Sequence, residues 1–251
     1  MSALSCDGLK LSYGSVLAVD DVSFSIEENE WVSIVGPNGA GKTSLLNLLN
    51  GFNEPDEGRI YLQDDDITLL PPWKRARRGL GRTFQQGELF EDEDAVENML
   101  TIRGLTRPVR LWEALLWVGP GRRKEAENVR AVEEMIDYLE LWEYRHDPVG
   151  SLPLGIQKRI SLGRSLMLDP DVILLDEIMS GLTFDEKYDM VRFISDLWEQ
   201  EGLTIIMIEH DLQVVTSVSE RIVALNEGRV IADGPPETVA NDPHVKEVYT
   251  G

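Results

Sequence analysis

A glycine-rich segment around residue 40 has the residue types and spacing of a phosphate-binding loop. Residues 36–43 fit the pattern G-x-x-x-x-G-K-[ST] at every position. Glycines let backbone N–H groups face a phosphate, the Lys42 ammonium can reach the β- and γ-phosphates, and the Thr43 hydroxyl can ligate Mg²⁺. The loop follows the apolar run 31–35 and precedes leucines at helical spacing, which predicts the strand, loop and helix that the motif requires. The residues predicted to bind the nucleotide here are Gly36, Pro37, Asn38, Gly39, Ala40, Gly41, Lys42, Thr43 and Ser44.

Two carboxylates follow a second apolar run, residues 172–175. A buried strand would place Asp176 and Glu177 together at its exit. Asp176 can hold Mg²⁺ through water, and Glu177 can orient and deprotonate the attacking water, which are the two tasks that phosphoryl transfer leaves to carboxylates. The alternative is a strand followed by a solvated acidic turn, which is the less favoured interpretation even for the segment taken alone. Its occurrence with the phosphate-binding loop favours the phosphoryl-transfer interpretation.

A histidine follows the third apolar run, residues 204–208. Lone histidines are more often structural than catalytic. His210, however, leaves the end of another predicted core strand, where it would face the same crevice and could donate a hydrogen bond to the γ-phosphate or the attacking water. The other two histidines, His146 and His244, lie in polar, turn-like segments and are interpreted as structural or surface residues.

The elements that must position these groups fall into three regions. Residues 4–85 are β-rich, with alternating patterns at Leu9–Tyr13 and Val22–Ile26. From about 86 to 152 strand signals vanish, and prolines and glycines separate several predicted helices. After residue 152, continuous apolar strands alternate with helical patterns, which predicts a parallel sheet covered on both faces and a ligand at the carboxyl ends of its strands. The apolar residues that recur at helical spacing in the middle region are Val129, Val132, Met135, Ile136 and Leu139.

Composition limits the class of protein. The 251 residues are 42% hydrophobic, and none of the apolar runs approaches the ~20 residues of a membrane-spanning helix. The start of the chain lacks the pattern of a secretory signal, so a cytosolic location is expected. Cys6 is the only cysteine, which excludes an internal disulfide or a cysteine-rich metal site.

The charge is strongly acidic, because 24 lysines and arginines face 45 aspartates and glutamates, for a net charge of -21. This balance argues against nucleic-acid binding. The cations are seven lysines and seventeen arginines. An acidic, lysine-poor surface suits a cytoplasm at high salt, but an ordinary acidic mesophile remains the alternative. A rise of the unfolding midpoint from dilute to molar KCl would support the first interpretation.

Together and in this order, the motifs resemble those of the ATP-binding subunits of ABC transporters, and the likeness covers nearly the whole chain. The resemblance implies an α/β P-loop NTPase cassette: a mixed sheet core with an N-terminal antiparallel β-subdomain and an inserted helical subdomain. It implies one ABC ATPase domain over residues 4–251, in which 4–85 and 153–251 form the nucleotide-binding core and 86–152 form the helical subdomain. ATP and Mg²⁺ are the cofactors that it implies.

The same resemblance assigns further roles. Tyr13 matches the aromatic residue that stacks on adenine, although a strand residue packing on its neighbour is the alternative. Gln85 matches the glutamine that ligates Mg²⁺ and senses the membrane domain, Gly181-Leu182-Thr183 matches the loop that crosses to the partner ATPase, and His210 matches the switch histidine. By this resemblance Glu177, His210 and Gln85 act in hydrolysis, and Thr43, Gln85 and Asp176 hold the metal.

Several local segments resemble more narrowly the ATPases of branched-chain amino acid importers. They are residues 36–43, 79–85, 176–182, 208–211 and 245–251. The resemblance implies a cargo of hydrophobic amino acids or related amides or urea. It also implies a second ATPase subunit, two transmembrane permeases, an extracytoplasmic binding protein that acts indirectly, and a position on the cytoplasmic face of the membrane.

One segment departs from the family pattern. The signature segment, usually Leu-Ser-Gly-Gly-Gln or Leu-Ser-Tyr-Gly-Gln, corresponds to residues 152–157, in which Pro153 replaces the serine that reaches the γ-phosphate on the opposite subunit. Proline suits the beginning of a helix, which Ile156, Ile160, Leu162 and Leu166 would continue. The N–H of Gly155 and the helix dipole remain available to a phosphate. The residues matched to the partner's site are Pro153, Leu154, Gly155 and Gln157.

Three other functions compete with this interpretation. A soluble ABC-type ATPase acting in translation or repair would usually carry two cassettes or a coiled-coil arm, and would act on nucleic acid. A regulatory subunit that hydrolyses ATP poorly is suggested by Pro153 and opposed by Glu177 and His210. A nucleotide kinase or GTPase would share the phosphate-binding loop without Gln85 and 181–182. The apolar face of residues 112–117 either packs internally or contacts a permease.

Overall fold

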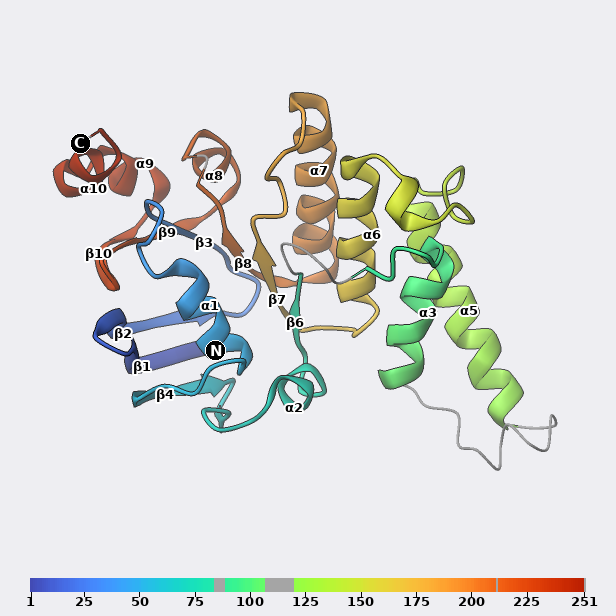
Figure 1. Cartoon of the computed structure of the whole chain (residues 1–251), viewed down its shortest axis with the longest axis horizontal. Helices are drawn as coiled ribbons and strands as arrows, with labels where there is room; N and C mark the ends of the chain where they lie inside the picture. Colours follow the sequence, from blue (N-terminus) through green and yellow to red (C-terminus); the bar gives the residue numbers. More distant parts are fainter. Residues whose placement is uncertain (84–88, 107–119, 211, 251) are drawn as a thin grey trace.

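The computed structural model describes residues 1–83, 89–106, 120–210 and 212–250. Figure 1 shows two sheets on one side of the molecule and a group of helices on the other. The first sheet is antiparallel, has the strand order β2-β1-β4-β5, and is formed by the alternating N-terminal segments. Its strands are β1 (Ser2–Tyr13), β2 (Val16–Glu27), β4 (Glu57–Leu62) and β5 (Asp65–Asp66).

The second sheet has six strands in the order β10-β9-β3-β8-β7-β6. Neighbouring strands from β9 to β6 run parallel, and β10 pairs antiparallel with β9 at the edge. Because the central strands are buried on both faces, their sequences are continuously apolar. The strands are β3 (Trp31–Val35), β6 (Leu80–Arg82), β7 (Val172–Asp176), β8 (Thr204–Ile208), β9 (Arg221–Asn226) and β10 (Arg229–Gly234).

Helices cover both faces of this sheet. Helix α1 lies between the two sheets, α6 and α7 lie on the other face, and α3 and α5 pack outside α6 (Figure 1). The helices are α1 (Lys42–Asn50), α2 (Pro72–Ala76), α3 (Ala95–Thr106), α5 (Pro120–Tyr138), α6 (Leu154–Leu166), α7 (Phe184–Glu201), α8 (Leu212–Val218), α9 (Pro236–Asn241) and α10 (Pro243–Thr250), with the 3₁₀ turn η1 (Val149–Ser151). Among the described residues, we find no helix that is both long enough and apolar enough to span a membrane.

Alternate residues of each central strand enter two different hydrophobic clusters. In β8, Ile206 and Ile208 pack with α1 and the antiparallel sheet, whereas Ile205 and Met207 pack with the helices of the other face. The second cluster continues into the helical region through Met99 of α3. The apolar core is therefore continuous from the six-stranded sheet into the helical region.

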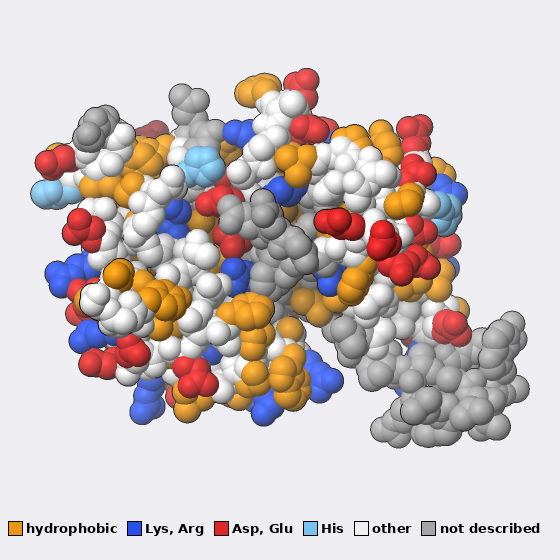
Figure 2. All heavy atoms as spheres, viewed as in Figure 1, with side chains coloured by type: hydrophobic (Ala, Val, Ile, Leu, Met, Phe, Trp, Pro, Cys, Tyr) orange, Lys and Arg blue, Asp and Glu red, His pale blue; other side chains and the backbone are white. Residues whose placement is uncertain are grey.

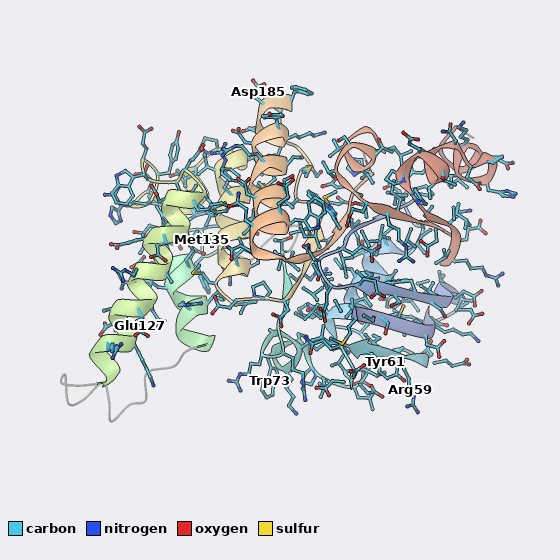
Figure 3. The ribbon with its side chains drawn as sticks, turned by 180° about the vertical axis from the view of Figure 1, so that it is seen from behind. Arg59, Tyr61, Trp73, Glu127, Met135 and Asp185 are labelled. Carbon is cyan, nitrogen blue, oxygen red and sulfur yellow. The ribbon has the colours of Figure 1, made fainter. Side chains whose placement is uncertain are left out.

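Helix α6 joins the helical region to the sheet by close packing. A Cβ on Gly163 of α6 would lie 2.5 Å from the methyl carbon of Met99 and 3.2 Å from Cγ of Met135. Figure 3 shows Met135 on the side of α5 that faces α6, and Asp185 at the beginning of α7. A larger residue at position 163 would separate the three helices.

The end of helix α1 is fixed by a buried arginine. Arg75 is fully buried and donates hydrogen bonds to the backbone carbonyls of Leu48, Leu49, Thr68 and Leu70, at 2.6 to 2.8 Å. Two of these carbonyls belong to the last turn of α1, where helix geometry leaves carbonyls without partners. Burial lowers the pKa of Arg75 to about 10, so the side chain is still a cation at neutral pH.

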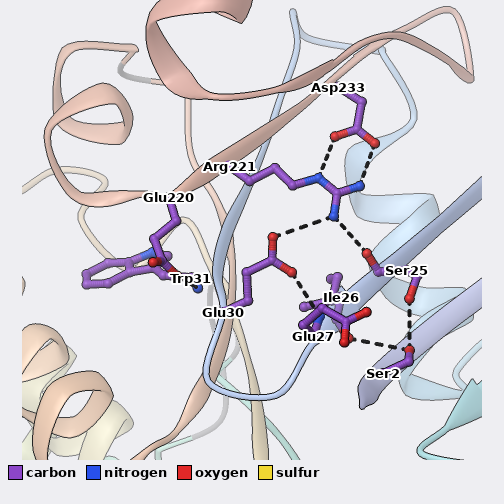
Figure 4. Close-up of polar contacts among 9 residues, drawn as sticks. All are labelled: Ser2, Ser25, Ile26, Glu27, Glu30, Trp31, Glu220, Arg221 and Asp233. Atoms are coloured by element: carbon purple, nitrogen blue, oxygen red, sulfur yellow. Dashed lines mark hydrogen bonds and ion pairs between the residues drawn. The ribbon is translucent and has the colours of Figure 1, made fainter.

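The amino ends of the parallel strands carry a separate polar cluster, shown in Figure 4. Arg221, the first residue of β9, forms a bidentate ion pair with Asp233 at 2.6 and 2.7 Å. It also donates to the carbonyl of Ser25 at 2.8 Å and pairs with Glu30 at 3.5 Å. The Arg221 cluster, defined as Arg221, Asp233, Glu30 and Ser25, ties the six-stranded sheet to β2 of the antiparallel sheet.

The acidic composition is visible on the surface. Figure 2 shows Asp and Glu side chains spread over the core and the helical region of the visible face, with fewer cations between them. On the back, Figure 3 places the exposed Trp73 on α2, away from the helical region.

The fold class predicted from the sequence is confirmed, including the antiparallel N-terminal sheet, the parallel core strands and the helical region. Val129, Val132, Met135 and Ile136 lie on α5, as the helical spacing predicted, but they are not equally buried. The buried face of α5 includes Asn128, Val132 and Ile136, whereas Val129 is 38% exposed. The stripe therefore begins at a buried asparagine, which a pattern of apolar residues does not reveal.

Candidate functional site

The three apolar strands end at the same edge of the sheet. Ile34 of β3 is paired in register with Ile208 of β8, and Ile208 is paired with Asp176 of β7. The residues that follow these strands, at positions 36, 177 and 209–210, therefore leave the sheet side by side, as the sequence predicted.

The phosphate-binding loop passes so close to neighbouring backbone that only glycine fits. A Cβ on Gly36 would collide with the carbonyl oxygen of Leu225 in β9, and a Cβ on Gly41 would collide with that of Ala18 in β2. Gly41 also has a φ of 98°, in the left-handed region. It is the N-cap of α1 and gives no side-chain cap, so the first N–H groups of the helix remain available to an anion.

Lys42 begins helix α1 and is 7% exposed. Its ammonium donates hydrogen bonds to the carbonyl oxygens of Gly36 at 2.6 Å and Pro37 at 3.0 Å, both in its own loop. Burial lowers the pKa of Lys42, while Glu177 and Asp176 oppose that shift by favouring the cation. A positive charge is thus held inside the loop, next to the two carboxylates at the exit of β7.

Asp176 is buried and forms an ion pair with Arg82 of β6. The distance between Nη2 of Arg82 and Oδ2 of Asp176 is 2.9 Å, and both side chains are 5% exposed. Arg82 also donates to the side-chain oxygen of Asn47 in α1 at 2.8 Å, and its guanidinium lies over the ring of Phe52. The buried carboxylate of Asp176 is therefore balanced by a cation from the neighbouring strand.

Glu177 is half-buried and has a left-handed backbone, with a φ of 46°. Its N–H donates to the carbonyl of Ile208 at 3.0 Å. Its carbonyl accepts from the ammonium of Lys158 at 3.1 Å and from the N–H of Ser180 at 3.1 Å. Left-handed backbone is uncommon for a residue other than glycine and indicates local strain held by its surroundings.

Glu209 lies behind these residues, at the end of β8. It is 2% exposed, and its carboxylate accepts a hydrogen bond from the N–H of Met179 at 2.9 Å. Burial raises the pKa of Glu209. The hydrogen bond from Met179 and the nearby His210 and Lys158 oppose this shift. Lys158 is itself buried on α6, and burial lowers its pKa.

The structure places the other predicted residues as follows. Thr43 and His210 are exposed at the same edge of the sheet. Tyr13 is 48% exposed at the end of β1, where it pairs with Val16 of β2. Ala18, on the same hairpin, lies against Gly41 of the phosphate-binding loop. Gln85 and the residues at 112–117 lie outside the described residues.

The signature segment begins helix α6 as predicted, with Pro153 as its N-cap. Pro153 and Leu154 are exposed, and the amide of Gln157 turns back to the carbonyl of Leu152 at 2.8 Å. A Cβ on Gly155 would collide with the carboxylate of Glu186 in α7. The beginning of α6 therefore lies against the beginning of α7, with Leu154 close to Gly181.

The described residues fit a nucleotide with a divalent cation. The glycine cradle, the open beginning of α1 and the buried ammonium of Lys42 suit phosphate groups. The Thr43 hydroxyl and the Asp176 carboxylate are oxygen donors of the kind that Mg²⁺ prefers. The carboxylate of Glu177 follows directly, which suits deprotonation of water.

Sequence reasoning assigned no role to three charged residues of this site: Arg82, Lys158 and Glu209. Arg82 ends a short strand, and its partner is 94 residues away. Lys158 lies on a helix, where a lysine is normally expected on the solvent side. For Glu209 a signal existed, because it directly follows an apolar run in the same way as Asp176.

Two family models match the sequence. Residues 19–180 match the ABC transporter model. Residues 229–251 match the model of the branched-chain amino acid ATP-binding cassette transporter. The second match covers β10, α9 and α10, which follow the last residue of the candidate site.

Curated relatives match over the full length. The chain is 37% identical to the high-affinity branched-chain amino acid transport ATP-binding protein BraF of Pseudomonas aeruginosa, over 99% of this chain and 97% of the relative. It is 35% identical to LivG of Escherichia coli, a protein of the same description, with the same coverage. It is also 33% identical to the lipopolysaccharide export system ATP-binding protein LptB of Haemophilus influenzae, over 100% and 98% of the two chains.

Solved structures of ATP-binding cassettes are similar to this chain over its full length. A nucleotide-free ATP-binding cassette from an ABC transporter superposes with a TM-score of 0.87 at 29% identity, and each chain is covered completely. The ADP conformation of the cassette MJ1267 gives a TM-score of 0.84 at 29% identity, with 100% and 99% coverage.

Proposed function

The chain belongs to the ABC transporter family of ATP-binding proteins, and from this premise we propose that it is the ATPase subunit of an importer for branched-chain or other hydrophobic amino acids, or for related amides or urea. As a member of that family it is an ATPase, homologous to branched-chain amino acid transport ATPases. The observation that carries the narrower cargo class is the match of residues 229–251 to the branched-chain amino acid cassette model.

Lipopolysaccharide export is the second candidate, because LptB is 33% identical over the full chain. It is less favoured than amino acid import for two reasons. BraF and LivG are more similar, and the C-terminal match is to the amino acid transporter model.

In the proposed mechanism each residue of the site has one task. The loop 36–44 binds the phosphates through N–H groups and Lys42, and Tyr13 stacks on the adenine. Thr43, Asp176 and Gln85 hold Mg²⁺, which when bound neutralises charge on the β- and γ-phosphates. Glu177 takes a proton from the attacking water at its carboxylate, and His210 donates a hydrogen bond on the same side.

The proposed assembly contains two ATPase subunits, identical or paralogous, arranged head to tail. Each would present the beginning of its α6, residues 153–157, to the nucleotide held by the other. The helical region 86–152 would transmit closure to two transmembrane permeases, and an extracytoplasmic binding protein would deliver the cargo. The chain would then sit on the cytoplasmic face of the membrane.

Replacing Glu177 with glutamine tests the hydrolytic step. General-base catalysis is worth roughly 10²- to 10⁴-fold, so E177Q should lower kcat by about that factor while nucleotide binding is retained. Steady-state phosphate release and equilibrium ATP binding measure the two quantities separately. Hydrolysis at the wild-type rate in E177Q would remove Glu177 as the base.

Pro153 gives a test of the head-to-tail arrangement. Proline supplies neither a hydroxyl nor an N–H to the opposite phosphate, so the site that this chain completes for its partner should lack one charge-assisted hydrogen bond, a loss of about 1 to 3 kcal/mol. Pro153→Ser should therefore raise the ATPase rate of the assembled complex. An unchanged rate would contradict a role of position 153 in the partner's site.

The cargo and partners require capture of the complex. We expect the tagged chain, purified from native membranes, to bring with it two multi-spanning permeases, a second ATPase and an amino-acid-type binding protein. Recovery of lipopolysaccharide export components would favour the second candidate. Recovery of ribosomes or nucleic-acid proteins would favour a soluble mechanical ATPase instead.

A further inference from the structure

The backbone around Glu177 is held by two buried charged side chains from other elements. Lys158 of α6 donates its ammonium to the carbonyl of Glu177 at 3.1 Å. Glu209 at the end of β8 accepts the N–H of Met179 at 2.9 Å. The two side chains are 8% and 2% exposed. The carbonyl of Glu177 and the N–H of Met179 are thus each held by a buried side chain, and the two side chains carry opposite charges.

Neither charge is needed for a stable core. Burying an ionised group is unfavourable, and well-packed apolar residues at such positions are often as stable or more so. The two charges lie close enough that each favours the charged form of the other. They contact the carbonyl of Glu177 and the N–H of Met179, and Glu177 itself has a left-handed backbone that needs such support.

We propose that Lys158 and Glu209 are positioning residues for ATP hydrolysis, which hold the backbone of residues 177–179 so that the carboxylate of Glu177 points at the attacking water. This inference rests on the proposed role of Glu177. Lys158 and Glu209 act through their contacts with the backbone of this segment.

The position of Lys158 adds a link between the two sites of the assembly. Lys158 lies on α6 five residues after Pro153, at the beginning of the helix that would complete the partner's site. Because its ammonium contacts the carbonyl of Glu177, a shift of α6 moves the support of this chain's own base. Docking of α6 on the partner's nucleotide would therefore be sensed at Glu177.

The test compares Lys158→Met with Lys158→Arg in the full chain and in the assembled complex. Misplacing a catalytic group by about 1 Å can reduce a rate by about 10²-fold. We expect Lys158→Met to lower kcat by about 10- to 100-fold while the Kd for ATP changes by less than about threefold. Lys158→Arg, which keeps a cationic donor, should recover most of the rate.

A readout independent of activity is amide hydrogen exchange in the nucleotide-free chain. Lys158→Met and Glu209→Ala should accelerate exchange in a peptide covering residues 177–182, with the rest of the six-stranded sheet unchanged. If Lys158→Met does not fold, Glu209→Gln serves as the second variant. It keeps an acceptor for Met179 but removes the charge facing Lys158, so it should lower kcat by about 3- to 10-fold.

Matched controls are Lys10→Met and Glu57→Gln, which remove the two partners of an exposed ion pair at 3.0 Å on the antiparallel sheet. Both should leave kcat, Kd and exchange unchanged. The inference is overturned if Lys158→Met leaves kcat unchanged, or if kcat and the affinity for ATP fall together with a general loss of exchange protection. E177Q, measured in parallel, distinguishes failure of this inference from failure of the proposed function. If E177Q hydrolyses ATP at the wild-type rate, the proposed role of Glu177 as the base is itself wrong.

Discussion

The two ends of the six-stranded sheet hold charge in different ways. At the amino end, Arg221 is 27% exposed and meets Asp233 in a bidentate pair, with a backbone carbonyl and Glu30 as further partners (Figure 4). At the carboxyl end, Lys42, Lys158 and Glu209 are almost completely buried and are bonded to backbone groups.

The difference shows which end is built for stability. A half-exposed bidentate pair loses little hydration and gains a defined geometry, so it fixes the sheet at little cost. Charges buried as deeply as those of Lys42, Lys158 and Glu209 are costly to remove from water. The buried charges of the carboxyl end therefore cost stability, and phosphates with a cation at the proposed site would help to balance them.

The largest expected effect is that of Arg82→Met. It removes the buried cation that faces Asp176, and breaking such a pair typically destabilises a protein by about 3 to 5 kcal/mol. We expect urea unfolding of the nucleotide-free variant to show a loss of about that size. Mg²⁺ with nucleotide should restore more stability to the variant than it adds to the wild type, because the metal replaces the missing cation at Asp176.

Two controls isolate this effect. Nucleotide with a chelator should give no extra recovery, because the phosphates add negative charge without the metal. Arg59→Met removes an exposed arginine whose contact with Asp66 is 3.8 Å, and it should change the free energy of unfolding by less than about 0.5 kcal/mol. Equal recovery of wild type and Arg82→Met with Mg²⁺ and nucleotide would contradict the assignment of Asp176 as a metal ligand.

Arg221→Met should have a smaller effect of a different kind. We expect a loss of about 1 to 2 kcal/mol, because the pair is bidentate but partly exposed. The loss should shrink in 1 M KCl, where the Debye length is about 3 Å, and Mg²⁺ with nucleotide should leave it unchanged. If Mg²⁺ with nucleotide restored the lost stability of Arg221→Met, the two ends of the sheet would be energetically coupled and could not be treated as separate.

The sequence predicted the strands and the loop because their signals are local. Apolar runs of about five residues followed by glycine or carboxylates identify β3 and β7 and the edge at which they end. The phosphate-binding loop was predicted residue by residue. Backbone passes close to Gly36 and Gly41, while Gly39 has open space around it and a left-handed φ of 85°.

The supporting charges could not be predicted because their partners are distant in sequence. Arg82 meets Asp176 across 94 residues, and Lys158 meets a backbone carbonyl that any residue at 177 would supply. The left-handed backbone of Glu177 also leaves no signal, because glutamate is not a residue type that indicates this conformation. A contact between a charged side chain and a distant backbone group cannot be predicted from the residue type at either position.

The smallest expected effect concerns the pH dependence of stability, and it separates stability from activity. Burial raises the pKa of Glu209 in the folded chain above its unfolded value of about 4.3. The folded state therefore keeps a proton that the unfolded state has released, so this residue's contribution to stability is present below the unfolded pKa and is lost as pH rises through the folded pKa. Glu209→Gln does not titrate, and its amide oxygen can still accept the N–H of Met179.

We expect the free energy of unfolding of Glu209→Gln, relative to wild type, to rise between pH 4.5 and neutral pH. Urea unfolding of both chains across this range measures the difference. At neutral pH the variant should be at least as stable as the wild type yet hydrolyse ATP more slowly, whereas Arg221→Met should be less stable and hydrolyse ATP at the wild-type rate. If stability and kcat both fall in Glu209→Gln, Glu209 has a structural role. A buried charge that serves catalysis should instead lower stability, whereas the Arg221 cluster should increase it.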